Sequence, residues 1–377
     1  ASDVYKRQPE PTPVGFSTPA PTSNIEAIVA GRVQATVQVI STMDHSITTT
    51  TPSSTPAVSF QASESTVRST RIVVSDRSLW AGHPASNAVI GLSLPDGERV
   101  WQTMIGCEPT TLTHSYSRLF VTCFDTGELV ILDVGSGEVL KRKWVGHGAF
   151  GVIESTGRLY ISLAHEQSIL VLDADTLEGI TRAPTAHQPR GLALKENQLY
   201  VVHLIDASVS VFDSATLNVR GSISIGLQAG LAESVTLDPN KARAYVPHQR
   251  QHITNMARSF DNTIFPTVSV LDTERLRPIR REALALDSID TPVGMPIAVV
   301  LSEDGTLLYV ANAASDDISV IDLTQGIGVG HIPVGHHPRD LALSPDGDRL
   351  YTSNMVSDNV SVIDTDTLLS LIHISEP

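Results

Sequence analysis

Residues 308–322 read LYVANAASDDISVID, and residues 350–364 repeat them as LYTSNMVSDNVSVID. Each copy holds two short runs rich in β-branched and aromatic residues, with a polar turn between them. This pattern is typical of paired antiparallel strands. Because the same unit returns after about forty residues, the chain is predicted to have a repeat architecture.

Related units occur on the N-terminal side of these two copies, and together the units extend from about residue 66 to residue 369. The third strand of each unit ends with an apolar residue followed by a polar residue, which is Asp in six units and Ser in the first. We call this polar residue the anchor. In six units the anchor lies ten positions after the end of the second strand, as from Asn312 to Asp322. The seven anchors are Ser93, Asp133, Asp173, Asp213, Asp272, Asp322 and Asp364.

Four short strands in each of seven units predict an all-β fold, a seven-bladed β-propeller of four-stranded antiparallel blades. The anchor Asp residues follow the repeat, so we expect them to fix turns rather than to act in catalysis. The last blade is truncated after its third strand. Either an N-terminal segment supplies the missing outer strand or residues 368–374 occupy that position, and we favour the second arrangement.

The ends of the chain differ in composition from the repeats. Residues 1–8 (ASDVYKRQ) and 370–377 (SLIHISEP) resemble translated sequencing-library adapter, as found in assembled environmental reads, and we expect neither to be native. Residues 9–65 are rich in Ser, Thr and Pro and are predicted to be an extension or linker. The propeller is assigned to residues 66–369, and the chain is expected to be a fragment.

Composition excludes several classes of function. With 26 Lys and Arg against 41 Asp and Glu, the net charge of −15 argues against electrostatic binding of nucleic acid. No apolar run approaches the roughly 18 residues of a membrane-spanning helix. The sequence lacks Cys-x-x-Cys-His, Gly-x-Ser-x-Gly and His-Glu-x-x-His motifs, so it names no catalytic residue, and no metal site is predicted.

Histidines gather at two positions of the repeat that should open on the same face of the propeller. These positions are the loop before the first strand and the end of the second strand. Arg190 and Arg339 follow in a His-x-Pro-Arg frame and are expected to point toward the centre. The candidate residues of this His-rich rim are His83, His147, His165, His187, Arg190, His203, His248, His252, Asn312, His336, His337, Arg339 and Asn354.

Two interpretations of the rim remain open. The rim is a polar binding face for a ligand, a metal or a haem edge, since His and Cys are common metal ligands. Alternatively, His replaces Asn as a residue that hydrogen-bonds the loop backbone. A general polar binding face is the favoured interpretation.

Two insertions are expected on the same rim. In the fifth unit the spacing from the end of the second strand, His248, to the anchor Asp272 is 24 positions. The other units have ten, so 14 residues are added within 249–266. The spacing from the anchor Asp272 to Gly294, which opens the next unit, is 22 positions. In five other units this spacing is 13, so nine residues are added near 282–291. The first insertion carries His252, Arg258, Phe260 and Phe265, and it is predicted to form a lid or a partner contact. The alternative is a neutral insertion at the surface.

The two cysteines lie at neighbouring ends of adjacent strands. Cys107 precedes the first strand of its blade and Cys123 ends the second, so their Cα atoms should lie within disulfide range. A disulfide is predicted, which indicates an oxidising compartment. The alternative is a pair of small buried apolar side chains.

The two quoted runs, together with Val334-Gly335-His336-His337-Pro338, resemble the YVTN-type propeller repeat. The resemblance covers about residues 66–369 and is weakest in the first, fourth and fifth units. It implies a seven-bladed propeller located outside the cytoplasm, in the periplasm or at the cell surface. It also implies a relation in fold to quinoprotein amine dehydrogenase chains and surface-layer proteins.

Residues 335–341, 261–266 and 292–296 resemble propellers fused to di-haem cytochrome c peroxidase-type domains. This resemblance implies a haem c domain downstream and no cofactor within the chain itself. The expected function is a non-catalytic binding or scaffold propeller that meets a cytochrome c-type domain, another protein or a small ligand at the His-rich rim. The alternatives are a lactonase-like or quinoprotein dehydrogenase-like enzyme and a cell-surface adhesion module.

Overall fold

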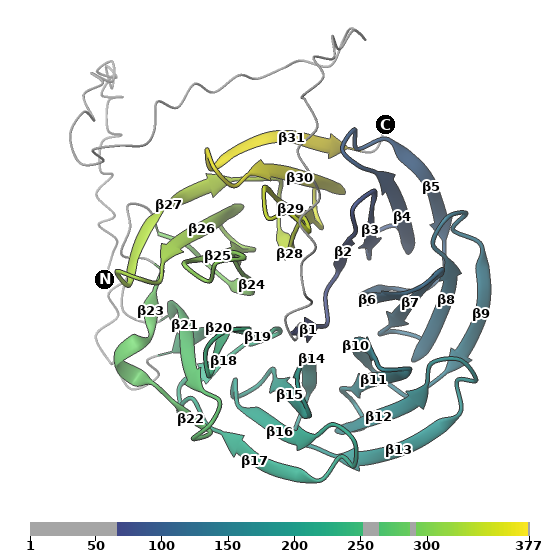
Figure 1. Ribbon diagram of the computed structural model, residues 1–377, viewed down its shortest axis with the longest axis horizontal. Coiled ribbons are helices and arrows are strands. Elements are labelled where there is room, and N and C mark those ends of the chain that lie inside the picture. Colours follow the sequence, from purple (N-terminus) through teal and green to yellow (C-terminus); the bar gives the residue numbers. More distant parts are fainter. Residues whose placement is uncertain (1–65, 252–263, 287–291, 376–377) are drawn as a thin grey trace, which may run out of the picture. The chain divides into compact units, whose positions relative to one another are not determined.

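The computed structural model describes residues 66–251, 264–286 and 292–375. Their strands form seven antiparallel sheets, arranged as blades around a common centre (Figure 1). The prediction of an all-β, seven-bladed propeller is therefore confirmed. No helix long and apolar enough to cross a membrane occurs in the described part of the chain.

Six blades have four strands in chain order, with the first strand innermost. Blade one holds β2 (Ile72–Val74), β3 (Ser78–His83), β4 (Ala88–Ser93) and β5 (Arg99–Met104). Blade two holds β6 (Pro109–Ser115), β7 (Arg118–Cys123), β8 (Glu128–Asp133) and β9 (Val139–Trp144). Blade three holds β10 (Ala149–Ser155), β11 (Arg158–Leu163), β12 (Ser168–Asp173) and β13 (Gly179–Pro184).

The later blades continue the ring. Blade four holds β14 (Pro189–Lys195), β15 (Gln198–His203), β16 (Val209–Asp213) and β17 (Val219–Ile223). Blade six holds β24 (Pro296–Leu301), β25 (Leu307–Asn312), β26 (Asp317–Asp322) and β27 (Ile327–Pro333). Blade seven holds β28 (Pro338–Leu343), β29 (Arg349–Asn354), β30 (Asn359–Asp364) and β31 (Leu369–Ser375). Because β31 pairs with β30, residues 369–375 form the outer strand, the arrangement favoured from the sequence.

Blade five is the irregular blade, and it also carries both insertions. Its inner strand is split into β18 (Ala229–Gly230) and β19 (Thr236–Leu237), while β20 (Arg243–Gln251) and β21 (Ile264–Asp272) each lengthen to nine residues. The outer strand is split into β22 (Arg277–Pro278) and β23 (Leu284–Ala285), with the 3₁₀ helix η1 (Arg280–Glu282) between them. The second insertion thus interrupts the outer strand as well as lengthening a loop. Residues 252–263 and 287–291 lie outside the described residues.

One aromatic position packs every blade against the next. Tyr160 donates from its hydroxyl to the carbonyl of Ser214 in the following blade at 3.1 Å, and Trp80 Nε1 donates to the carbonyl of Val134 at 3.1 Å. A partner for the polar tip lets such a large ring be buried. The seven residues at this position are all buried: Trp80, Phe120, Tyr160, Tyr200, Tyr245, Tyr309 and Tyr351.

The anchor Asp residues fix the turns after the third strands, as expected. Asp133 Oδ1 accepts hydrogen bonds from the backbone N–H of Gly135 at 3.0 Å and of Ser136 at 2.8 Å. The same pair of bonds recurs at Asp173, Asp213, Asp272 and Asp322. These carboxylates are therefore used structurally.

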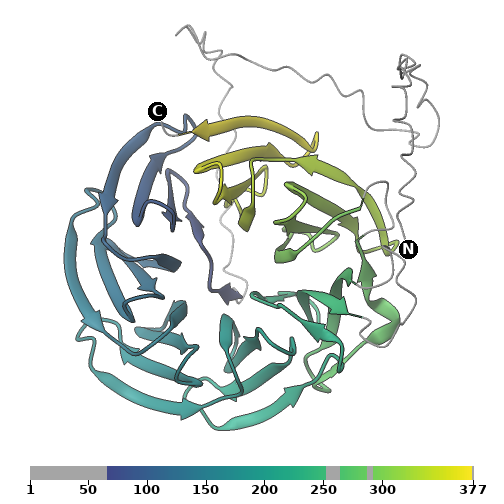
Figure 2. The ribbon, with the colours of Figure 1, turned by 180° about the vertical axis from the view of Figure 1, so that it is seen from behind.

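A short segment crosses the centre of the ring. β1 (Val67–Arg68) pairs with β14 of blade four, and the backbone N–H of Arg71 donates to Asp340 Oδ2 of blade seven at 2.6 Å. Arg68 Nη1 also donates to Asp340 Oδ1 at 2.9 Å. Both views show β1 in the middle of the ring (Figures 1 and 2). We call residues 67–71 the central strap; the sequence pattern did not predict it.

Candidate functional site

Irregular pairing at the start of the innermost strands brings polar side chains to the centre. The register between first and second strands shifts after Pro109, Ala149, Pro189, Pro296 and Pro338. β-Bulges of this kind change the direction of side chains and often lie beside functional sites. Phe150, Arg190 and Arg339 each directly follow one of these residues.

Three arginines and one carboxylate meet at the centre of the ring. Glu233 Oε2 accepts from Arg71 Nη2 at 3.2 Å and from Arg339 Nη2 at 2.8 Å. The guanidinium of Arg190 lies 4.6 Å from the ring centre of Phe150 and also stacks on Phe124. We call Arg71, Arg190, Glu233 and Arg339 the central cluster.

The charges of the central cluster do not balance. Burial lowers the pKa of Arg71 to about 10, and the nearby charge of Arg339 adds to this shift. Burial also lowers the pKa of Arg190. Burial alone would raise the pKa of Glu233, but the charges of Arg339, Arg71 and Arg190 outweigh it and hold that pKa below its usual value. Three positive charges and one negative charge leave a net charge of +2 in a protein of net charge −15.

Two small cavities lie against the central cluster, and Arg71 and Arg339 line both of them. The first cavity is also lined by Phe150, Glu233 and Asp340 and by Ser69 of the central strap. The second extends toward the seam between blades seven and one and is lined by His83, Asn354 and Met355. Each cavity has room for about one water molecule.

Four of the predicted rim residues are buried and hydrogen-bonded inside their blades. His203 Nε2 lies 2.9 Å from Ser210 Oγ, and His248 Nε2 lies 2.9 Å from Ser269 Oγ. Asn312 and Asn354 donate from Nδ2 to Ser319 and Ser361 in the same manner. Burial lowers the pKa of both His203 and His248 and favours the neutral ring. These side chains fit the interpretation that His replaces Asn, and Asn354 in addition lines the second cavity.

A second group of rim residues remains accessible around the central cluster. The exposed members are His147, His165, His187 and His336, and His337 is half-buried. His336 Nδ1 lies 2.7 Å from Asp316 Oδ2, and the ring of His165 packs edge-on against Phe124 at 5.0 Å. His83 belongs to neither group: it is 3 % exposed and pairs with Asp358 of blade seven. His252 lies outside the described residues.

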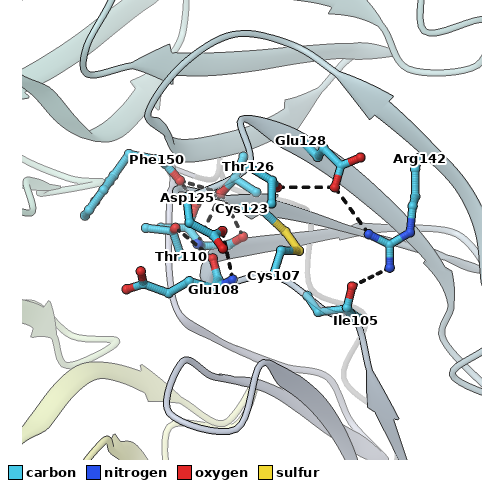
Figure 3. The surroundings of a disulfide bond; sticks show 12 residues. Ile105, Cys107, Glu108, Thr110, Cys123, Asp125, Thr126, Glu128, Arg142 and Phe150 are labelled. Carbon is cyan, nitrogen blue, oxygen red and sulfur yellow. Dashed lines mark hydrogen bonds and ion pairs between the residues drawn. A yellow bond between two sulfur atoms is a disulfide. The ribbon is translucent and has the colours of Figure 1, made fainter.

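The predicted disulfide is confirmed. Cys107 and Cys123 are bonded, with their Cα atoms 5.7 Å apart (Figure 3). Beside the bond, the backbone N–H of Glu108 donates to Asp125 Oδ1 at 2.9 Å. The cross-link therefore fixes the turn that carries Phe124, one of the two rings under Arg190. Within residues 66–251, 264–286 and 292–375, no three His, Cys, Asp or Glu side chains converge in a way that could hold a metal ion.

The sequence predicted Arg190 and Arg339 at the centre but not their partners. Arg71, Phe150 and Glu233 were missed because each carries a different residue type at the start of its blade. A positional signal was present, since Phe150 and Arg190 lie forty residues apart, each directly after the first residue of its inner strand.

Comparisons with known proteins agree with the fold. Residues 268–373 match a family model described as "Lactonase, 7-bladed beta-propeller". A search of curated proteins found no match.

Two solved structures show the same architecture. Kuenenia stuttgartiensis hydrazine synthase superposes with a TM-score of 0.71 at 18% identity, covering 78% of this chain and 95% of that chain. The Pan2 WD40 domain of Neurospora crassa gives a TM-score of 0.58 at 14% identity, covering 82% of this chain and 91% of that one. Neither likeness extends beyond the fold. The resemblance to YVTN repeats and to peroxidase fusions stays a prediction, and the chain is a seven-bladed β-propeller that matches the lactonase family over residues 268–373.

Proposed function

We propose that the chain is an extracytoplasmic binding propeller that holds a small carboxylate or phosphate at its centre, with Arg190 and Arg339 as the main contacts. The observation that carries this proposal is the gathering of three guanidinium groups around the carboxylate of Glu233. A site lined by one sign of charge within low-dielectric walls concentrates ions of the opposite sign.

The hydrogen-bonding state of the arginines supports an anionic ligand. The Nε atoms of Arg190 and Arg339 are buried and have no partner among the described residues. An unsatisfied buried donor costs about 1–3 kcal/mol, and a carboxylate or phosphate oxygen would relieve that cost. Guanidinium groups also present several donors in one plane, which suits recognition of carboxylate and phosphate.

The rim around the cluster supports the further proposal of a protein partner of the cytochrome c type. Apolar side chains are also exposed in loops of blades four and five, with Ile205 63 % exposed, Leu231 40 % exposed and Leu227 fully exposed. The backbone N–H of Leu231 donates to the carbonyl of Leu204, so two of these loops adjoin. The disulfide is consistent with an oxidising location for such an encounter.

The anion proposal is tested by titration calorimetry with inorganic phosphate and with citrate at low ionic strength. We expect Arg190→Gln and Arg339→Gln each to weaken binding about tenfold, the loss of roughly one charge-assisted hydrogen bond. Arg220→Gln is the matched control because Arg220 pairs with Asp213 on the outer part of blade four. Equal binding by all three variants would rule out the centre as the anion site.

The protein-partner proposal is tested with a soluble c-type cytochrome as the probe. Leu227→Asp and Leu231→Asp should weaken its binding, because they place charge in the apolar part of the rim. Leu140→Asp, on the outer strand β9, should not. Equal effects from the rim and outer-strand variants would refute the rim as the docking face.

A further inference from the structure

The bulges that carry Phe150 and Arg190 belong to neighbouring blades, and each takes backbone groups out of the strand pairing. In blade three the register of β10 against β11 shifts after Ala149, and in blade four the register of β14 against β15 shifts after Pro189. A buried backbone group that loses its strand partner must bond to another group or cost free energy. The direction of both side chains therefore depends on what bonds to these backbone groups.

One hydroxyl group bonds to both bulges. Ser162, on β11, accepts a hydrogen bond from the backbone N–H of Gly151 at 2.8 Å and donates one to the carbonyl of Arg190 at 2.6 Å. Ser162 is completely buried. Gly151 directly follows Phe150, whose ring centre lies 4.6 Å from the guanidinium carbon of Arg190. The hydroxyl therefore connects the backbones of the two residues whose side chains stack at the centre.

The two bulges are also in close backbone contact, which requires glycine at the second position of each. A Cβ atom on Gly151 would lie 2.7 Å from the carbonyl oxygen of Arg190, and one on Gly191 would lie 2.4 Å from that of Glu233. Glycine permits such close approach of two backbones. The backbone N–H of Gly191 donates to the carbonyl of Glu233 at 3.0 Å, so bonding between successive bulges continues into blade five.

The same position in the neighbouring blades separates the role of the hydroxyl from that of the side-chain volume. This position is the fifth residue of the second strand, and it holds Thr122 in blade two and Val202 in blade four, both completely buried. Thr122 Oγ1 donates to the carbonyl of Phe150 at 2.5 Å, as Ser162 does to that of Arg190. The blades thus accommodate Ser, Thr or Val here, and the two hydroxyl groups each bond to the bulge of the following blade.

We propose that Ser162 is the positioning residue for Arg190. Its hydroxyl holds the bulge of blade four against that of blade three, so that the guanidinium group stays stacked on Phe150 and its buried Nε–H is available to an anion. Ser162 does not bind the anion itself, because its two hydrogen bonds both end on backbone groups. The inference rests on the proposed anion site, and it goes further by naming a residue outside the central cluster that sets the affinity of that site.

Ser162→Thr and Ser162→Val form a matched pair of variants, because the two side chains have the same shape and differ in one hydroxyl group. The affinity for inorganic phosphate is measured by titration calorimetry at low ionic strength. We expect Ser162→Thr to bind within about twofold of the wild type and Ser162→Val to bind about fivefold more weakly, the effect of one lost hydrogen bond. Equal affinities of the two variants would overturn the proposal.

A double-mutant cycle distinguishes positioning of Arg190 from a general structural effect. If Ser162 acts through Arg190, Ser162→Val should weaken phosphate binding by less than about 1.5-fold when Arg190→Gln is already present. The full effect should remain in the presence of Arg339→Gln. Ser319→Ala is the control, since Ser319 is equally buried but bonds to Asn312 within blade six, and it should leave the affinity unchanged. An undiminished effect of Ser162→Val beside Arg190→Gln would contradict the proposal.

The stacking of Arg190 on Phe150 gives a second readout that needs no anion. The NMR resonance of the Arg190 Nε–H, assigned by its absence in Arg190→Gln, is shifted by the ring currents of the stacked phenyl groups. It should move in Ser162→Val and stay in place in Ser162→Thr. An unmoved resonance in Ser162→Val would refute the positioning role alone. A wild-type protein that binds no phosphate would refute the anion site, whereas the NMR comparison would still decide whether Ser162 positions Arg190.

Discussion

Glu233 Oε2 lies 2.8 Å from Arg339 Nη2, and this contact joins blade five to blade seven across the centre of the ring. The same oxygen accepts from Arg71 of the central strap. Residues separated by more than a hundred positions thus share one buried carboxylate. Each blade alone would leave its charged residue unpaired, so the ring must close before the cluster can form.

Substitution of Glu233 tests how the cluster is balanced. Glu233→Gln removes the carboxylate that is hydrogen-bonded to both Arg71 and Arg339, and we expect a loss of about 3 kcal/mol in the free energy of unfolding. Phosphate should raise the urea concentration at the midpoint of unfolding more for the variant than for the wild type, because it replaces the missing negative charge. Urea denaturation with and without phosphate measures both effects. Glu282→Gln, which removes a more exposed partner of Arg243, should show neither.

The pH dependence of stability follows from the low pKa of Glu233. A carboxyl whose pKa is lower in the folded than in the unfolded state contributes stability above its unfolded value, here about 4.5. That contribution is lost as the pH falls through the lower folded pKa. The wild type and Glu233→Gln should therefore differ most near neutral pH and converge in acid. A difference that stays constant from pH 7 to pH 3 would contradict the assigned charges.

The turn at Asp213 gives a spectroscopic prediction. Arg220 and the backbone and hydroxyl of Thr216 lower the pKa of Asp213 to about 2. A ¹³C titration should place its midpoint near that value, below the ordinary 3.8. As for Glu233, the pKa of Asp213 is lower in the folded than in the unfolded state. Its contribution to folding stability should therefore be lost as the pH falls from about 4 to about 2. Arg220→Gln should move the midpoint upward; an unchanged midpoint would refute the role of Arg220.

The disulfide is expected to stabilise the second blade. A cross-link spanning 16 positions contributes about 3 kcal/mol by restricting the unfolded chain. Replacement of both Cys107 and Cys123 by Ser should lower the free energy of unfolding by that amount. Dithiothreitol should destabilise the wild type to a similar extent and leave the double variant unchanged. A reductant effect in the double variant would point to a different cause.

The central strap should be as well protected as the sheet it joins. The backbone N–H of Ser69 donates to the carbonyl of Leu192 at 2.8 Å, and β1 pairs with β14. Hydrogen exchange at residues 67–71 should therefore be as slow as in β14. Arg68→Ala removes a partly buried partner of Asp340 and should accelerate that exchange, whereas Arg220→Ala should not. Fast exchange throughout the wild-type strap would show that it does not stay in the centre.

The features that the sequence predicted are those that recur within one unit. These features are local: they are the apolar–Asp anchors, the strand lengths and the spacing of Cys107 and Cys123. Periodicity and strand geometry were therefore sufficient to predict them. The central cluster is not local, because Arg71 and Glu233 are 162 positions apart and meet only when the ring closes. Periodicity places both near the same face but does not say which side chains touch.

The histidines illustrate the same limit. His83 and His203 occupy one position of the repeat, yet one pairs across a blade seam and the other within its blade. The difference depends on whether the residue seven positions later is Ile90 or Ser210. A count of histidines on the rim could not separate the two roles, whereas a comparison of their third-strand partners would have done so.

The anion site at the centre of the ring can be tested by anomalous diffraction from crystals soaked in selenate. We expect a selenium peak at the centre, within hydrogen-bonding distance of the guanidinium groups of Arg190 and Arg339. The peak should be lost in Arg339→Gln and kept in Arg220→Gln. Selenate bound only on the outer strands, with nothing at the centre, would contradict the proposal that this propeller holds an anion.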